Sequence, residues 1–96
     1  MAQYELMSII RPDLDEEHLE STVESVGNIV TQAGGAIQQV DKWGKRHLAY
    51  PVDGHPDGYY VVISFTGSGP ISNEIVRVLN ITEPVMRSIV VRTDPE

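Results

Sequence analysis

The sequence has no cysteine, few basic residues and no long apolar run. Without cysteine there is no disulfide framework and no thiol chemistry, which suits a reducing cytosol. No apolar stretch approaches the length that spans a membrane, and the start of the chain lacks the features of a secretory signal, so we expect a cytosolic protein. Seven Lys and Arg against fourteen Asp and Glu give a net charge of −7. This balance argues against a protein that coats nucleic acid without specificity.

The length of 96 residues and the hydrophobic fraction of 41% bound the architecture. They predict a single domain over residues 1–96, which can bury a modest core without metals or disulfides. His18, His47 and His55 fall in different predicted elements without the spacing of metal ligands, so we expect no metal site. The segment Gly67-Ser68-Gly69 lacks the longer glycine pattern and the lysine of a phosphate-binding loop, and we interpret it as a connector.

The few basic residues gather in one place. Lys42, Lys45 and Arg46 fall within five residues, and Trp43 lies among them. Lys45 and Arg46 belong to the segment 44–52. In this segment no nucleophile stands beside a base and no second metal ligand stands next to the histidine, so it does not predict catalysis. Positive charge concentrated on an acidic chain indicates instead a small, specific contact with a polyanion.

Two segments carry apolar residues at helical spacing. The first begins after Asp13, which can cap a helix that has Glu16 three residues later. It ends at Gly34-Gly35, since glycine accepts the left-handed conformation of a helix C-cap. The second follows Pro70, a residue suited to the first turn of a helix. The apolar stripes are Leu19, Val23, Val26, Val30 and Ala33 in the first helix and Ile71, Ile75, Val78 and Leu79 in the second.

Runs of apolar and β-branched residues predict the extended segments. These segments are residues 4–10, 36–40, 46–52, 59–66 and 85–92. The segments 36–40 and 46–52 stand on either side of a polar turn that includes Gly44. Pro51 removes a backbone donor, so we expect the strand that contains it at an edge of the sheet. A loop rich in turn-forming residues is expected over residues 53–58.

The order of elements is β-α-β-β-α-β. Right-handed crossovers place both helices on one face, which predicts an α+β, ferredoxin-like fold with a four-stranded antiparallel sheet. The opposite face then lacks helices, and strand alternation makes it too apolar to be left exposed to water, so we expect a partner protein there. The expected partner-binding residues are Met7, Ile9, Tyr60, Val62, Ile89 and Val91, with Arg87 as a lone charge among them.

Short motifs along the whole chain are similar to those of one known family. They are Tyr4-Glu5, Arg11-Pro12-Asp13-Leu14, Gly34-Gly35, Gly44-x-Arg46-x-Leu48-Ala49-Tyr50, Gly58-Tyr59-Tyr60, Leu79-Asn80 and Val85-x-Arg87. In these motifs, in length and in element order the chain resembles the family of the sixth protein of the bacterial small ribosomal subunit. At two places where many members carry basic residues, this chain has Ala2-Gln3 and Asp53-Gly54, which bears on how many RNA contacts it makes.

The resemblance implies a ferredoxin-like, structural protein of the small ribosomal subunit in the cytoplasm, without enzymatic activity. It also implies binding to the central domain of 16S ribosomal RNA together with the eighteenth small-subunit protein, a small basic partner whose charge suits this acidic chain. We expect no cofactor, no metal, no membrane contact and no small-molecule substrate. The RNA-binding residues that we expect are Lys42, Trp43, Lys45, Arg46, Arg87 and Arg92.

Several alternatives stay open at this point. Arg87 either pairs with Glu5 across the sheet or reaches RNA or the partner. Lys45, Arg46 and Arg92 are contacts to RNA in one interpretation and solvated side chains in the other. For the function, the alternative is a ferredoxin-like dimeric regulatory or ligand-binding module, which would dimerise through the helix-free face. Such a module would need polar groups that converge in a pocket.

Overall fold

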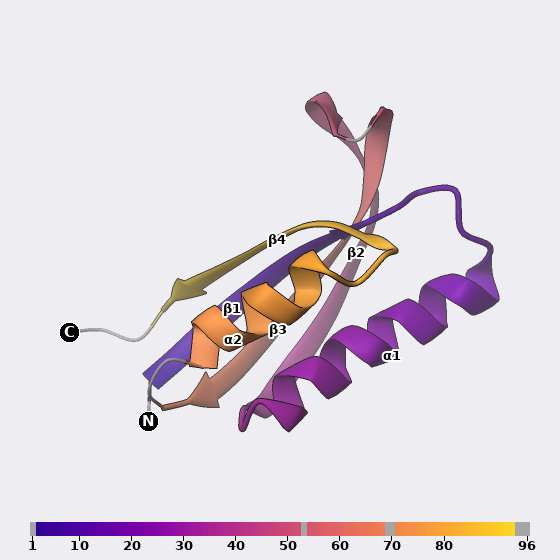
Figure 1. Ribbon diagram of the computed structural model, residues 1–96. Helices are drawn as coiled ribbons and strands as arrows, with labels where there is room; N and C mark the ends of the chain where they lie inside the picture. The colour runs from indigo at the N-terminus through magenta and orange to yellow at the C-terminus, as the bar shows by residue number, and fades with distance from the viewer. Residues whose placement is uncertain (1, 53, 69–70, 94–96) are drawn as a thin grey trace.

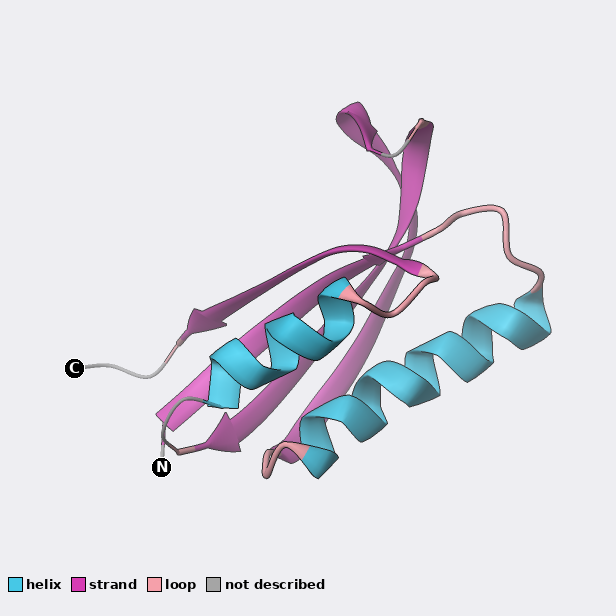
Figure 2. Ribbon diagram, in the orientation of Figure 1, coloured by secondary structure: helices cyan, strands magenta, loops and turns pink. Residues whose placement is uncertain are grey.

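The computed structural model describes residues 2–52, 54–68 and 71–93, so the predictions that fall on Asp53, Gly69 and Pro70 lie outside the described residues. The elements are β1 (Ala2–Ile10), α1 (Glu16–Gln32), β2 (Ala36–Val52), β3 (His55–Gly67), α2 (Ile71–Asn80) and β4 (Val85–Arg92). The strands form one sheet in the order β2-β3-β1-β4, with all neighbouring pairs antiparallel. Both helices lie on one side of this sheet (Figure 1, Figure 2). The predicted ferredoxin-like α+β fold is confirmed.

The core lies between the sheet and the helices. Leu6 of β1 and Ile63 and Phe65 of β3 are fully buried, because strand alternation turns all three toward the helices. The ring of Phe65 also stacks on that of Tyr4, with centroids 5.4 Å apart. The helices contribute residues of the predicted stripes, of which Val23, Val26, Val30, Ile71, Ile75 and Leu79 are buried. This packing holds the sheet in place and leaves its opposite face without helices.

The first helix begins at Glu16, and the cap predicted from the sequence is wrong. The N-cap is Asp15, whose carboxylate accepts a hydrogen bond from the backbone N–H of His18 at 2.8 Å. Asp13 instead forms an ion pair with Arg11, with 2.8 Å between Oδ2 and Nη2, which directs its carboxylate away from the helix. The bond from the His18 N–H stabilises the ionised carboxylate, and it therefore lowers the pKa of Asp15.

We expect Asp15→Ala to lower the melting temperature at pH 7 by about 4–8 °C, the shift that the loss of one helix cap produces in a domain of this size. Asp13→Ala is the matched control and should lower the melting temperature far less, because exposed ion pairs contribute little to folding stability. The pKa of Asp15 is lower in the folded than in the unfolded protein. The contribution of this cap to folding stability is therefore present at neutral pH and is lost as the pH falls below about 4. Thermal unfolding of both variants at pH 7 and pH 3 checks this, and equal shifts at pH 7 would contradict the assignment of the cap.

Strand β2 runs without interruption from Ala36 to Val52, and the predicted turn in its middle is wrong. Where the turn was expected, the register with β3 shifts between Lys42 and Gly44, and Gly44 has a φ of 87°. Glycine accepts this φ because it has no Cβ, so the extra residue is absorbed as a bulge and pairing continues. Strand β3 likewise begins earlier than predicted, at His55, because the chain reverses in a short turn that includes Gly54.

The second half of β2 and the first half of β3 extend past the helices as a long hairpin at one end of the molecule (Figure 1). Strand β2 lies at a sheet edge, as Pro51 predicted. Leu48 is nevertheless only 7% exposed. Its side chain and that of Ile9 converge on Gly58, where an added Cβ would lie 2.3 Å from Ile9 Cγ2 and 3.7 Å from Leu48 Cδ2. The hairpin is thus anchored on the helix-free face by a small apolar contact.

Candidate functional site

The sheet face opposite the helices is the candidate site, and we call it the open face. The strand registers place its side chains in three rows that run across β2, β3, β1 and β4. The first row holds Gly44, Tyr60, Ile9 and Arg87, the second holds Asp41, Val62, Met7 and Ile89, and the third holds Gln39, Ser64, Glu5 and Val91. All the residues predicted to bind a partner therefore lie on one surface.

A shallow groove of about 220 Å³ lies on the open face where the hairpin meets the sheet. Its lining residues are Met7, Ile9, Leu48, Ala49, Tyr50, Val52, Tyr60, Arg87 and Ile89. The predicted partner-binding residues differ in their exposure. Val62 and Ile9 are only 4% and 8% exposed, whereas Ile89 and Val91 are 51% and 49% exposed. A protein on this face would therefore contact the exposed β4 side chains, and Val62 and Ile9 would lie below the contact surface.

Trp43 lies at the bulge of β2 and packs over the open face. Its ring stacks on that of Tyr60, with centroids 6.2 Å apart and 6° between the ring planes, and the Trp43 side chain keeps 46% of its surface exposed. Exposed aromatic rings of this kind are the surfaces on which unpaired nucleic-acid bases stack. Arg46 lies opposite Gly58 and so follows on the same face toward the hairpin.

The six predicted RNA-binding residues divide between the two faces of the sheet. Trp43, Arg46 and Arg87 share the open face, whereas Lys42, Lys45 and Arg92 do not. The ammonium of Lys42 forms an ion pair with Glu20 of α1, with 2.8 Å between Nζ and Oε2. The hydrogen bond to Glu20 raises the pKa of Lys42 and fixes this side chain on the helix side of the sheet.

Lys45 and Arg92 also belong to the helix side. Lys45 lies opposite Tyr59 on β3, and Arg92 lies opposite Tyr4 on β1. Both tyrosines pack against the core under the helices. Because opposite residues in a sheet point to the same face, Lys45 and Arg92 point away from the open face.

Arg87 does not form the internal ion pair with Glu5 that the sequence left open. Arg87 lies opposite Ile9, whereas Glu5 lies opposite Val91, so the two charges are separated by about 13 Å along the strands. The ion pairs found among the described residues do not include Arg87. Its guanidinium therefore lines the groove with its hydrogen-bonding capacity available to a ligand.

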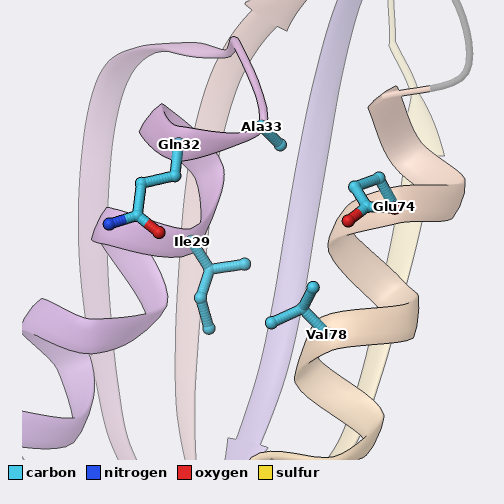
Figure 3. A pocket seen from close by; sticks show the side chains of 5 residues that line it. All are labelled: Ile29, Gln32, Ala33, Glu74 and Val78. Atoms are coloured by element: carbon cyan, nitrogen blue, oxygen red, sulfur yellow. The ribbon is translucent and has the colours of Figure 1, made fainter.

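A larger cavity of about 400 Å³ lies between α1 and α2, lined by Ile29, Gln32, Ala33, Glu74 and Val78. Figure 3 shows Ile29 and Val78 extending toward each other from the two helices. The carboxylate of Glu74 is held by Arg77, with 2.6 Å between Oε1 and Nη2. Only Gln32 adds a second polar side chain, so this cavity lacks the converging polar groups of a small-molecule site.

Histidine and carboxylate side chains do not gather into a metal-binding group in the described part of the chain. Within residues 2–52, 54–68 and 71–93, no group of three or more His, Asp and Glu side chains could hold a metal ion. His18 and His47 instead each contact one aspartate, Asp15 at 2.6 Å and Asp57 at 3.0 Å. In the same part of the chain, no helix is long and apolar enough to cross a membrane.

The sequence did not indicate the hairpin residues Leu48, Ala49, Tyr50 and Val52 as part of the site. Alternation along β2 could have indicated Leu48, Tyr50 and Val52, because they follow Arg46 at every second position and so point to the same face. Ala49 also lines the groove, and the register of β2 with β3 is irregular in this stretch, between His47 and Val52. Alternation alone does not indicate such an irregularity.

The four-stranded antiparallel sheet, with both helices on one side and the open face on the other, defines a ferredoxin-like protein. A family model described as ribosomal protein S6 matches residues 3–92. The small ribosomal subunit protein bS6 of Thermoanaerobacter pseudethanolicus is 44% identical over 94 residues, which cover 98% of this chain and 99% of that protein. The bS6 of Symbiobacterium thermophilum is 41% identical over 92 residues, covering 96% and 97%. The chain belongs to the ribosomal protein S6 family.

A solved structure agrees with this assignment. The 30S ribosomal protein S6 of Thermotoga maritima matches with a TM-score of 0.89 and 32% sequence identity, over 96% of this chain and 87% of that one. As a family member, the chain is a structural, non-enzymatic protein of the bacterial small ribosomal subunit, and it is located with ribosomes in the cytoplasm.

Proposed function

We propose that residues 1–96 act as one domain that binds the central domain of 16S ribosomal RNA together with the eighteenth small-subunit protein. The observation that carries the proposal is the open face. It combines exposed apolar side chains, an exposed aromatic stack and the guanidinium of Arg87, which forms no ion pair with the described residues, on one helix-free surface. Family membership supports the ribosomal setting, and the residues below supply the contacts.

The RNA contacts in this proposal come from Arg46, Arg87 and Trp43. Arginine offers a planar, permanently charged set of donors that suits phosphate oxygens. Trp43 offers an aromatic side chain that is about half exposed, on which a base can stack. Lys42, Lys45 and Arg92 can add contacts only where RNA reaches the helix side of the hairpin or sheet, and Lys42 must first leave Glu20.

The partner contacts come from the apolar part of the open face. Ile89 and Val91 are about half exposed on β4, next to the groove that Met7 and Tyr60 line. Burying such side chains against a second protein removes apolar surface from water, which favours association. The partner would also supply cations that this chain lacks, because the chain carries a net charge of −7.

The proposal is tested by titrating central-domain RNA at one fixed physiological salt concentration. Phosphate contacts supply most nucleic-acid affinity, so the chain alone should bind at least about tenfold more weakly than the chain with its basic partner. Equal affinity with and without the partner would contradict the proposal. A homodimer in size-exclusion chromatography that binds neither RNA nor partner would support the dimeric regulatory module instead.

Arg87→Ala is expected to weaken assembly with RNA and partner by about 1–3 kcal/mol, the range for hydrogen bonds to charged groups. The melting temperature of the isolated chain should barely change, since exposed charges contribute little to stability. Arg77→Ala is the matched control, because Arg77 lies on α2 on the other side of the sheet and should leave assembly unchanged. A large loss of melting temperature with unchanged assembly would instead make Arg87 a structural charge.

A further inference from the structure

The two edges of the sheet differ in how well they are protected against pairing with another chain. Natural proteins protect exposed edges with lysine, proline and bulges. The β2 edge has all three, because it contains Lys45 and Pro51 and its register with β3 shifts repeatedly. Strand β4 is the opposite edge and contains no lysine, proline or glycine (Figure 1). Its register with β1 is regular from Arg87 to Arg92, so the β4 edge offers a regular backbone for pairing.

The backbone groups that β4 directs outward belong to Ser88 and Val90. The N–H of Thr93 donates to the carbonyl of Gln3 at 2.8 Å, which makes these two residues a hydrogen-bonded pair of the β1–β4 ladder. Such pairs alternate along an antiparallel ladder, so odd-numbered residues of the regular stretch bond to β1 and even-numbered ones point away from it. No other described strand pairs with this edge, and β4 is at least partly exposed at every residue after Val85.

We propose that two copies of this chain, outside the ribosomal subunit, pair antiparallel through their β4 edges about a two-fold axis at Ile89. In this register Ser88 of each copy lies opposite Val90 of the other, so the outward backbone groups of both strands form hydrogen bonds with each other. The seam lies at the edges of the two sheets and covers neither open face. The inference concerns the unassembled chain and does not rest on the proposed function.

The side chains of β4 suit pairing with a second copy. On the open face, the half-exposed Ile89 lies opposite Ile89 of the second copy, and this apolar pair is shielded from water. Arg87 lies opposite Val91 of the second copy, so the pairing sets no two like charges directly opposite each other. Apolar and charged positions of one strand therefore match those of its own reversed copy.

The pairing also brings a carboxylate to Arg87, which forms no ion pair with the described residues of its own chain. Within each chain Val91 lies opposite Glu5. Arg87 of one copy is thus in one row with Val91 and Glu5 of the other, and about 10 Å separates the Cα atoms of Arg87 and Glu5, which two long side chains can span. The axis repeats this ion pair, and such charge complementarity favours a second copy over an unrelated extended segment.

Cross-linking of single-cysteine variants tests the register. The chain has no cysteine, so one introduced cysteine can form only an intermolecular disulfide. In the pair, the Cα atoms of position 89 lie about 4.5 Å apart across the axis, which is within the range for a disulfide. Val91→Cys is the matched control, because Val91 is as exposed on the same face, but its two copies lie about 13 Å apart.

Mild oxidation of the full chain at about 0.1 mM should convert most of the Ile89→Cys protein, and little of the Val91→Cys protein, to a covalent dimer. Gel electrophoresis without reductant measures both. Equal cross-linking of the two variants would overturn the inference, and so would the absence of cross-linking in Ile89→Cys.

The unchanged chain provides a second test. The seam is short, so sedimentation velocity should show a weak dimer that forms between about 0.01 and 1 mM. Over this range, amide hydrogen exchange at Ser88 and Val90 should slow, while exchange at Ile89, whose N–H already bonds to β1, should change far less. A chain that stays monomeric overturns the inference. A dimer without slower exchange at Ser88 and Val90 overturns it too, because its copies would then meet through another surface.

Charge reversal tests the ion pair across the seam. Arg87→Glu and Glu5→Arg should each raise the dissociation constant of the dimer about fivefold, and the double variant should restore it. Glu24→Arg changes the net charge as Glu5→Arg does, at an exposed position of α1, and should leave dimerisation nearly unchanged. A double variant that dimerises no better than the single variants would overturn the proposed register.

Discussion

Replacing Phe65 with alanine is expected to remove about 3–5 kcal/mol from the free energy of unfolding. Phe65 is fully buried at the centre of the core and stacks on Tyr4, so its loss removes transfer energy, leaves a cavity and ends the ring contact. Natural domains are stable by only about 5–15 kcal/mol, so the variant should be close to unfolding. Urea unfolding followed by circular dichroism measures the loss.

Tyr50→Ala is the control for this prediction. Tyr50 is 63% exposed on the hairpin, so the same type of truncation should change the free energy of unfolding by no more than about 0.5 kcal/mol. If the two variants lose similar stability, the core does not lie where the structure places it.

Replacing Gly58 with alanine is expected to cost about 1–3 kcal/mol of stability, the usual cost of an overfilled core. The new Cβ would lie 2.3 Å from Ile9 Cγ2, and this methyl is on a β-branched side chain that cannot swing aside easily. Ile9 and Leu48 would have to move apart, which loosens the hairpin and alters the groove. We therefore also expect weaker binding of the partner, measured on the same sample.

Gly27→Ala is the matched control, because it adds the same methyl group elsewhere. In α1 the new Cβ would lie 3.5 Å from Ile37 Cδ1, an ordinary contact. Glycine in a helix interior is destabilising relative to alanine. This variant should therefore gain roughly 0.5–1 kcal/mol in the free energy of unfolding and leave partner binding unchanged. We expect changes of opposite sign in the free energy of unfolding of the two variants, which tests the close approach of Ile9 to Gly58. A stabilised Gly58→Ala protein would rule that approach out.

The fold could be predicted because its patterns are local. Alternation in β1 and β3 and the helical spacing of residues such as Val26 and Ile75 each specify one buried face, and chirality then limits the topology. The hairpin was predicted less well for a physical reason. The stretch around Gly44 is as polar as a turn, and only pairing with β3 makes it a strand, with glycine taking the bulge. Such pairing depends on residues far along the chain.

The candidate site shows the same division between local and tertiary causes. The faces of Met7 and Ile89 followed from alternation, and so did the face of Arg87. Lys42 could not be assigned in this way, because its pairing with Glu20 exists only once α1 packs against the sheet. The charge of a side chain can be read from the sequence, but the availability of that charge to RNA depends on which neighbours the fold supplies.

The order of strands in the sheet has a consequence for the chain during its synthesis. Strand β1 leaves a translating ribosome first, yet both of its neighbours, β3 and β4, come from the second half of the chain. A nascent chain that has not reached residue 92 leaves one side of β1 without hydrogen-bonding partners. Every row of the open face also needs β4, so no shorter product presents the complete surface. Residues through β4 must therefore be synthesised before the chain can present the complete open face to RNA or to a second protein.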